Sequence, residues 1–95
     1  MRVLLVCAAG MSTSLLTTNM RKHAREGESI DALPADSVSE VKDDYDVFLL
    51  GPQIRYREKE VRDKVDGKPV AVVDMVVYGT MNGQAAMEAA RDIAR

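Results

Sequence analysis

The sequence predicts an α/β fold built on a four-stranded parallel sheet. Three short apolar segments, residues 2–6, 46–50 and 69–73, are too short for core helices and are typical of buried strands. Segments with helical spacing separate them, and Gly27 and Gly67 mark two of the boundaries. Strands that alternate with helices favour parallel pairing, with helices packed on both faces of the sheet.

The first half of the chain is expected to contain two strands and two helices. After the strand at 2–6, a helix over 12–26 ends at Gly27, with one of three hydroxyl residues as its cap. Its apolar stripe comprises Leu15, Leu16, Met20 and Ala24. The alternating segment 29–33 ends at a proline and predicts an edge strand. A short helix within 35–43 has Asp36 or Ser37 as its cap.

The second half repeats this alternation. The strand at 46–50 stops at Gly51-Pro52, and a charged helix near 55–65 follows it, ending before Gly67. The strand at 69–73 precedes a last helix over 82–94. The expected inward positions of the two helices are Tyr56, Val61, Val65, Ala86, Ala89, Ala90, Ile93 and Ala94.

An edge-like second strand and right-handed crossovers give the strand order 2-1-3-4, a flavodoxin-like arrangement. Ligands of such sheets bind beyond the carboxyl ends of the strands, where the order reverses between the first and third strands. Cys7 follows the first strand, Gln53 lies just beyond the third and Asp74 follows the fourth. We therefore expect these three strand ends to meet at one rim of the sheet.

Composition narrows the function. Ninety-five residues predict a single domain over 1–95, and a net charge of −2 gives no reason to expect nucleic acid as a partner. We expect no membrane helix and no secretion signal, because the apolar runs are too short. A lone cysteine cannot form an internal disulfide, so a reducing cytoplasm is the expected compartment.

The loop after the first strand is suited to an anion and to a reactive thiol. Cys7 is followed by small and hydroxyl residues: Ala8, Ala9, Gly10, Met11, Ser12, Thr13 and Ser14. Backbone N–H groups at the start of a helix bind anions, and the positive end of the helix dipole favours thiolate over thiol. The structural alternative is that Cys7 is a small buried residue that ends a core strand. A non-catalytic module for small anions or nucleotides also stays open.

A cysteine in a phosphate loop also occurs in phosphatases. The low-molecular-weight tyrosine phosphatases have an arginine six residues after the cysteine, where this chain has Thr13. No arginine or lysine lies between Cys7 and Met20, so the positive charge that would stabilise a hydrolytic transition state is missing. The loop therefore favours phosphoryl transfer over hydrolysis.

Three segments, CAAGMSTSLL, VFLLGPQIRY and PVAVVD followed by YG, resemble enzyme IIB of the lactose/cellobiose class of sugar phosphotransferase systems. The resemblance covers nearly the whole chain, in order, and its first two segments are specific. It implies a flavodoxin-like domain in which Cys7 becomes phosphocysteine. The phosphoryl donor is then a phosphohistidine of enzyme IIA, and the acceptor is a lactose-, cellobiose- or chitobiose-type sugar held by the membrane permease, enzyme IIC.

The same resemblance implies a cytoplasmic protein that associates with that permease, and we expect a monomer without cofactor or metal. Which sugar is transported does not follow from the sequence, because the permease selects it.

Other residues have two interpretations each. Gln53 and Tyr78 are possible rim contacts to the phosphoryl group or its donor. Alternatively, Gln53 lies in a surface turn and Tyr78 is a packing residue. Arg55 and Arg57 either meet acidic groups of a partner or are solvated. We expect Asp74 to cap the turn that follows it. His23, late in the first helix, is expected to be solvated rather than a second phosphoryl carrier. Met11 is a candidate for a docking surface around Cys7.

Overall fold

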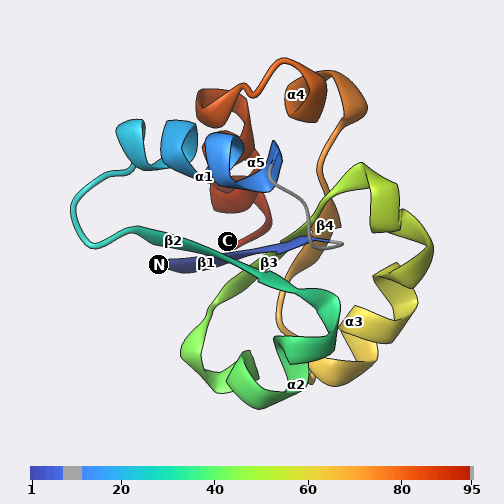
Figure 1. Ribbon diagram of the computed structural model, residues 1–95. Coiled ribbons are helices and arrows are strands. Elements are labelled where there is room, and N and C mark those ends of the chain that lie inside the picture. Colours follow the sequence, from blue (N-terminus) through green and yellow to red (C-terminus); the bar gives the residue numbers. More distant parts are fainter. Residues whose placement is uncertain (8–11, 95) are drawn as a thin grey trace.

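The computed structural model describes residues 1–7 and 12–94, and for residues 12–14 it describes the backbone alone. Its four strands are β1 (Arg2–Cys7), β2 (Ser29–Pro34), β3 (Val47–Leu50) and β4 (Val70–Val72). All of the pairings are parallel, and the order is β2-β1-β3-β4 (Figure 1). The predicted flavodoxin-like architecture, its order 2-1-3-4 and the edge position of the second strand are confirmed.

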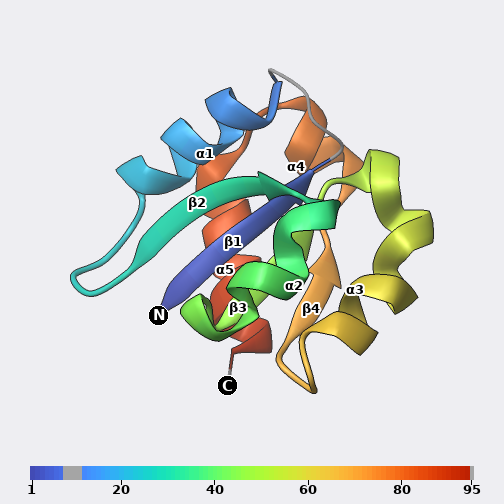
Figure 2. The same cartoon turned by 60° about the horizontal axis from the view of Figure 1, so that its bottom comes forward.

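Helices cover both faces of this sheet (Figures 1 and 2). One face packs against α1 (Ser12–Lys22), α4 (Met75–Gly79) and α5 (Gly83–Ile93). The other packs against α2 (Val38–Val41), α3 (Glu58–Lys64) and a 3-10 helix over Pro52–Arg57. Two shorter 3-10 turns flank α2, at Ala35–Ser37 and Lys42–Asp44.

The apolar run of β1 shows why the central strands carry no polar alternation. Val3 and Leu5 join the core beneath α1 and α5, whereas Leu4 and Val6 join the core beneath α2 and α3. All four side chains are fully buried. Successive side chains of a strand point to opposite faces, so a sheet covered on both sides requires an unbroken apolar run.

The first helix is shorter than predicted, and one of its inward positions is wrong. α1 ends at Lys22 rather than at residue 26, and the chain then turns through Gly27, which has a φ of 83°. Leu16 and Met20 are buried, but Leu15 is 54% exposed. Leu15 lies about 100° around the helix axis from Leu16, which places it outside the side that packs against the sheet.

The helix predicted near 55–65 divides into two parts. The 3-10 helix Pro52–Arg57 has a non-helical residue, Ile54, with φ −117° and ψ 24°, and α3 begins only at Glu58. This break changes the phase of the inward positions: Ile54 is buried and Tyr56 is 79% exposed. Val61 is buried within α3, as predicted.

Two smaller predictions also fail, and one helix was not predicted. Neither Asp36 nor Ser37 caps its helix through a side-chain hydrogen bond. In α5, Ala86 and Ala90 are buried as expected, but Ala89 and Ala94 are exposed and Met87 takes an inward position instead. The short helix α4 was not predicted. Within the described residues, no helix is both long and apolar enough to cross a membrane.

Candidate functional site

Cys7 is the last residue of β1, at the carboxyl end of the sheet. Its side chain is 9% exposed, and its thiol donates to the carbonyl oxygen of Leu33 on β2, with a sulfur–oxygen distance of 3.6 Å. In the register of the two strands Cys7 lies opposite Pro34. The sulfur is therefore held on the β2 side of its own strand end, next to the surface.

The three predicted strand ends do meet at this rim. The amide of Gly51, directly after β3, donates to the carbonyl oxygen of Val6 at 2.9 Å. The amide of Val73, directly after β4, donates to the carbonyl oxygen of Leu50 at 2.8 Å. The carboxyl ends of β1, β3 and β4 thus lie side by side at this rim, as the topology predicted.

The proposed phosphoryl-binding loop is only partly within the described residues. Ala8, Ala9, Gly10 and Met11 lie outside them. The backbone of Ser12, Thr13 and Ser14 forms the first turn of α1, so a helix N-terminus follows Cys7 after four intervening residues. Backbone amides at such a start are the donors that an anion requires.

Gln53 and Tyr78 are brought together above Gly51. A Cβ atom added to Gly51 would come within 3.0 Å of Oε1 of Gln53, 3.5 Å of Cε2 of Tyr78 and 3.8 Å of the carbonyl oxygen of Val6. The Gln53 carboxamide and the Tyr78 ring therefore lie beside Gly51, whose amide donates to the residue that precedes Cys7. Gln53 is exposed, while Tyr78 is only 7% exposed, so it is more deeply packed than the half-buried residue expected.

A largely apolar hollow of about 290 Å³ adjoins these two side chains. Its other lining residues are Pro52, Met75 and Gly79. Met75 and its neighbour Val76 are exposed at the start of α4. Apolar surface thus flanks the strand ends at the rim. The apolar pair after Asp74 is a sequence signal for this surface, although α4, the helix that presents it, was not predicted.

Asp74 caps α4, as expected. Its Oδ1 accepts from the amides of Val76 at 2.8 Å and Val77 at 3.3 Å. This carboxylate satisfies backbone donors at the start of the helix, so a structural role accounts for it.

The two arginines after β3 differ. Arg57 donates to Glu60 Oε2 at 2.6 Å and to Asp36 Oδ1 at 2.8 Å, while Arg55 is exposed. The hydrogen bonds from Glu60 and then Asp36 raise the pKa of Arg57. Arg57, followed by Lys64, lowers the pKa of Glu60 to about 2. Arg57 therefore links the segment after β3 to the turn after β2, so its role is structural.

His23 is exposed and lies just beyond the C-terminal end of α1, whereas Cys7 precedes the N-terminal end of the same helix. A larger hollow of about 570 Å³ lies along β2 and contains none of the predicted site residues. Within residues 1–7 and 12–94, no group of three or more His, Cys, Asp or Glu side chains could hold a metal ion.

Comparison with known proteins places this arrangement among phosphotransferase components. The "oligo-beta-mannoside-specific EIIB component" of Bacillus subtilis (strain 168) is 37% identical over 94 residues, with 94% of this chain and 91% of that protein covered. The galactose-specific EIIB component of Lactococcus lactis subsp. cremoris (strain MG1363) is 37% identical over 101 residues, covering 96% of this chain and 94% of that protein.

The solution structure of the cellobiose-specific phosphotransferase IIB component from Borrelia burgdorferi has a TM-score of 0.81 at 38% identity, covering 98% of this chain and 90% of that one. The family model for the lactose/cellobiose-specific IIB subunit of the phosphotransferase system matches residues 2–89. The chain therefore belongs to the lactose/cellobiose-specific IIB subunit family of the sugar phosphotransferase system.

Proposed function

We propose that residues 1–95 form one enzyme IIB domain in which Cys7 carries a phosphoryl group from enzyme IIA to a sugar. The observation that carries the proposal is the position of Cys7 in a member of this family: it ends β1 at the rim where three strand ends meet. Ligand sites of doubly wound sheets form at such a rim.

The proposed reaction consists of two transfers. In the first, Cys7 gives up its thiol proton to water and attacks as a thiolate: an S–P bond forms, the P–N bond of a phosphohistidine on enzyme IIA breaks, and the histidine nitrogen regains its lone pair. In the second, a P–O bond forms with a sugar hydroxyl and the S–P bond breaks, the sulfur leaving as a thiolate and the hydroxyl proton passing to that thiolate or to water. Both steps depend on positioning and on stabilising the charge of the transferred group. We assign that stabilisation to the loop 8–14.

Transfer rather than hydrolysis is supported by where the arginines lie. Residues 8–20 contain no arginine or lysine, and Thr13 stands where a cysteine phosphatase would have its arginine. Arg57, which follows β3, is held by Glu60 and Asp36. A cation that is already paired with two carboxylates is poorly placed to stabilise a phosphoryl transition state. The chain is thus suited to hold the phosphoryl group until an acceptor arrives.

Partner docking is assigned to the apolar surface beside Cys7. It comprises the hollow at Gln53 and Tyr78 together with exposed Met75 and Val76. An exposed apolar patch that borders a reactive group is typical of a protein contact. We assign Gln53 to contacts with the phosphoryl group or its donor, Tyr78 to the wall behind it, and Arg55 to acidic groups of a partner. In this proposal the domain works in the cytoplasm and docks successively on enzyme IIA and on the membrane enzyme IIC.

The sugar is proposed at the level of the family, as a lactose- or cellobiose-type sugar. The relatives are named for oligo-β-mannoside, galactose and cellobiose. The choice among them is assigned to the permease, since the IIB domain presents the phosphoryl group and the permease holds the sugar. No cofactor is required for either transfer.

The test is phosphorylation by a phosphorylated enzyme IIA, followed by intact-mass measurement and peptide mapping. We expect a single phosphoryl adduct on Cys7 in the native protein and in His23→Gln, and no adduct in Cys7→Ser. An adduct that survives Cys7→Ser would overturn the proposal. Aryl phosphate hydrolysis by the same sample tests the phosphatase alternative, for which turnover dependent on Cys7 would be required.

A further inference from the structure

In the part of the chain that the structure describes, no strand pairs with the outer edge of β2, which is the first strand in the sheet order. The amide of Ser29 donates to the carbonyl oxygen of Met1, which directs Ser29 and every second residue after it toward β1. The N–H and C=O groups of Ile30 and Ala32 therefore face outward. Such a row of backbone groups is a template on which another strand can pair.

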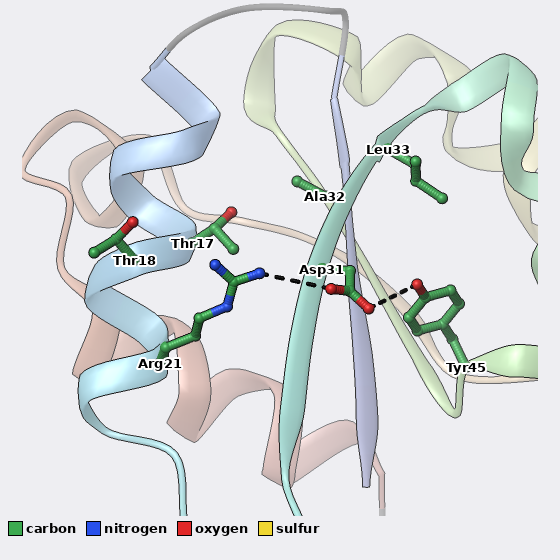
Figure 3. Close-up of a pocket in the computed structure, with 7 residues that line it drawn as sticks. All are labelled: Thr17, Thr18, Arg21, Asp31, Ala32, Leu33 and Tyr45. Atoms are coloured by element: carbon green, nitrogen blue, oxygen red, sulfur yellow. Dashed lines mark hydrogen bonds and ion pairs between the residues drawn. The ribbon is translucent and has the colours of Figure 1, made fainter.

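Arg21 covers one of these outward carbonyls. From α1 its Nε and Nη2 donate to the carbonyl oxygen of Ile30 at 3.1 and 2.8 Å. The same guanidinium lies 3.6 Å from Oδ1 of Asp31, whose Oδ2 accepts from the hydroxyl of Tyr45 at 2.8 Å. Figure 3 shows the resulting chain of contacts from α1 across β2 to Tyr45. Asp31 thus orients the arginine against the strand.

At the opposite edge of the sheet, an arginine likewise donates to an outward carbonyl of the edge strand, β4. The amide of Val73 donates to the carbonyl oxygen of Leu50, which directs the groups of Val70 and Val72 away from β3. From α3, Nη2 of Arg62 donates to the carbonyl oxygen of Val70 at 2.8 Å. Glu58 holds that guanidinium through Oε2, at 2.9 and 2.7 Å. Each edge strand therefore has one outward carbonyl occupied by an arginine that a carboxylate orients.

The β2 edge is the one with space for a further strand. The hollow of about 570 Å³ runs along it, between Thr17 and Thr18 of α1 on one side and Tyr45 on the other. Arg21 projects into this hollow (Figure 3). β2 has six residues and β4 has three, so β2 offers the longer ladder. A second copy of the chain presents the same edge, and two identical edges meet about a twofold axis.

We propose that Arg21 and Arg62 are edge-capping residues that keep the sheet closed to a second copy of this chain, with Arg21 covering the edge that would pair first. An added strand needs the Ile30 carbonyl as an acceptor and the space that the Arg21 side chain fills. Charged side chains placed on sheet edges block strand addition in this manner. The inference does not depend on the phosphoryl-transfer proposal.

The test compares molar mass by light scattering over a range of protein concentrations. We expect the native protein to keep the mass of one chain. Arg21→Met and Arg21→Ala should approach twice that mass as concentration rises, with slower amide hydrogen exchange at Ile30 and Ala32. Arg62→Met should show weaker association, with slower exchange at Val70 and Val72, and it supplies an independent arm if the Arg21 variants lose their circular dichroism spectrum.

Two variants separate capping from loss of charge. Lys22→Met removes one positive charge from the exposed surface of α1, and Asp31→Asn removes the ion pair but leaves both bonds from Arg21 to Ile30. We expect Lys22→Met to remain a single chain and Asp31→Asn to associate less than the Arg21 variants do. The proposal is overturned if folded Arg21 variants stay monomeric, if either control associates as strongly as they do, or if their association leaves exchange at Ile30 and Ala32 unchanged.

Discussion

At Gly51 the absence of a side chain determines where two neighbouring side chains lie. Its backbone is extended, with φ −61° and ψ 144°, so alanine can adopt it without backbone strain. The space is what is limited, because an added Cβ would stand 3.0 Å from Oε1 of Gln53. Alanine at this position should therefore displace the Gln53 carboxamide from the rim without removing it.

We predict that Gly51→Ala slows phosphoryl transfer to Cys7 roughly tenfold while changing stability by less than about 1 kcal/mol. Gly79→Ala is the comparison variant: it also adds a methyl group beside the hollow, but its Cβ would meet no atom within 4 Å, so it reports any effect on docking without displacing Gln53. Single-turnover transfer from phosphorylated enzyme IIA measures the rate. Equal rates in the two variants would show that the Gln53 position is immaterial.

How far these residues could be predicted from the sequence depends on what fixes each of them. Cys7 at a strand end follows from the apolar run before it, and the presence of Gln53 at the same rim follows from parallel topology. The burial of Tyr78 could not be predicted, because it depends on how α4 packs over Gly51. The contact of Cys7 with Leu33 also escaped, since it requires the register of β1 against β2. The phosphoryl-binding role of residues 8–11 stays a prediction, because these residues lie outside the described part of the chain.

At the scale of elements, the close packing of α1 against α5 depends on Gly83. A Cβ added there would lie 2.3 Å from the carbonyl carbon of Asn19 and 2.5 Å from the amide nitrogen of Met20. Backbone atoms cannot rotate away as a side chain can. α1 is also joined to the turn that precedes α5, because Nδ2 of Asn19 donates to the carbonyl oxygen of Met81 at 2.9 Å.

We predict that Gly83→Ala lowers the free energy of unfolding by about 2–3 kcal/mol, because α5 must move away from α1. Alanine is otherwise the better helix former, so an isolated helix would gain stability from this change. Urea denaturation followed by circular dichroism gives the value, with Gly79→Ala again as the control. A Gly83→Ala protein as stable as the native one would mean that the two helices do not approach so closely.

The segment between α1 and β2 is fastened to α5 by an ion pair. Arg91 donates to both carboxylate oxygens of Glu28, at 2.9 and 2.7 Å, and to the carbonyl oxygen of His23 at 2.8 Å. The hydrogen bond from Arg91 lowers the pKa of Glu28 from 4.5 to about 2. A depressed carboxyl pKa stabilises the folded state above the unfolded-state pKa, and this contribution is lost as pH falls.

The native protein should therefore lose stability between about pH 5 and pH 2, with Glu28 contributing on the order of 2 kcal/mol to that loss. Glu28→Gln should have a flatter profile over the same range and lower stability at neutral pH. Urea midpoints measured across this pH range test both expectations. Parallel profiles for the two proteins would exclude Glu28 as a source of the acid sensitivity.

The strands were predicted better than the helices, for a physical reason. Buried runs such as 46–50 and 69–73 are recognisable because both faces of the sheet are covered, and the structure confirms β3 and β4 within them. The helices bury one side, so a small shift of phase changes which residues face inward. The 3-10 helix after Gly51 changes the phase of the inward-facing positions, and Tyr56 is therefore exposed. α4 was missed because its first residues, Met75 and Val76, are exposed and apolar.

At the scale of the whole molecule, the sheet separates two cores that meet only through its strands. The core beneath α1 and α5 contains Leu5 and Leu49, and the core beneath α2 and α3 contains Leu4 and Phe48. Leu4 and Leu5 are successive residues of a central strand, and both are fully buried. Cavities made at Leu4 and at Leu5 therefore lie at neighbouring positions of the same strand but on opposite faces of the sheet.

We predict that Leu4→Ala and Leu5→Ala each lower the free energy of unfolding by about 3 kcal/mol, since a buried leucine loses its packing and leaves a cavity. Both variants should unfold in one transition, because β1 belongs to both cores and neither layer of helices can keep its packing without it. Native-state hydrogen exchange provides the sharper measurement. If the sheet couples the layers, either substitution will speed exchange in α3 and α5 by a similar factor. Acceleration confined to α3 in Leu4→Ala and to α5 in Leu5→Ala would mean instead that the two faces open independently, as separate cooperative units.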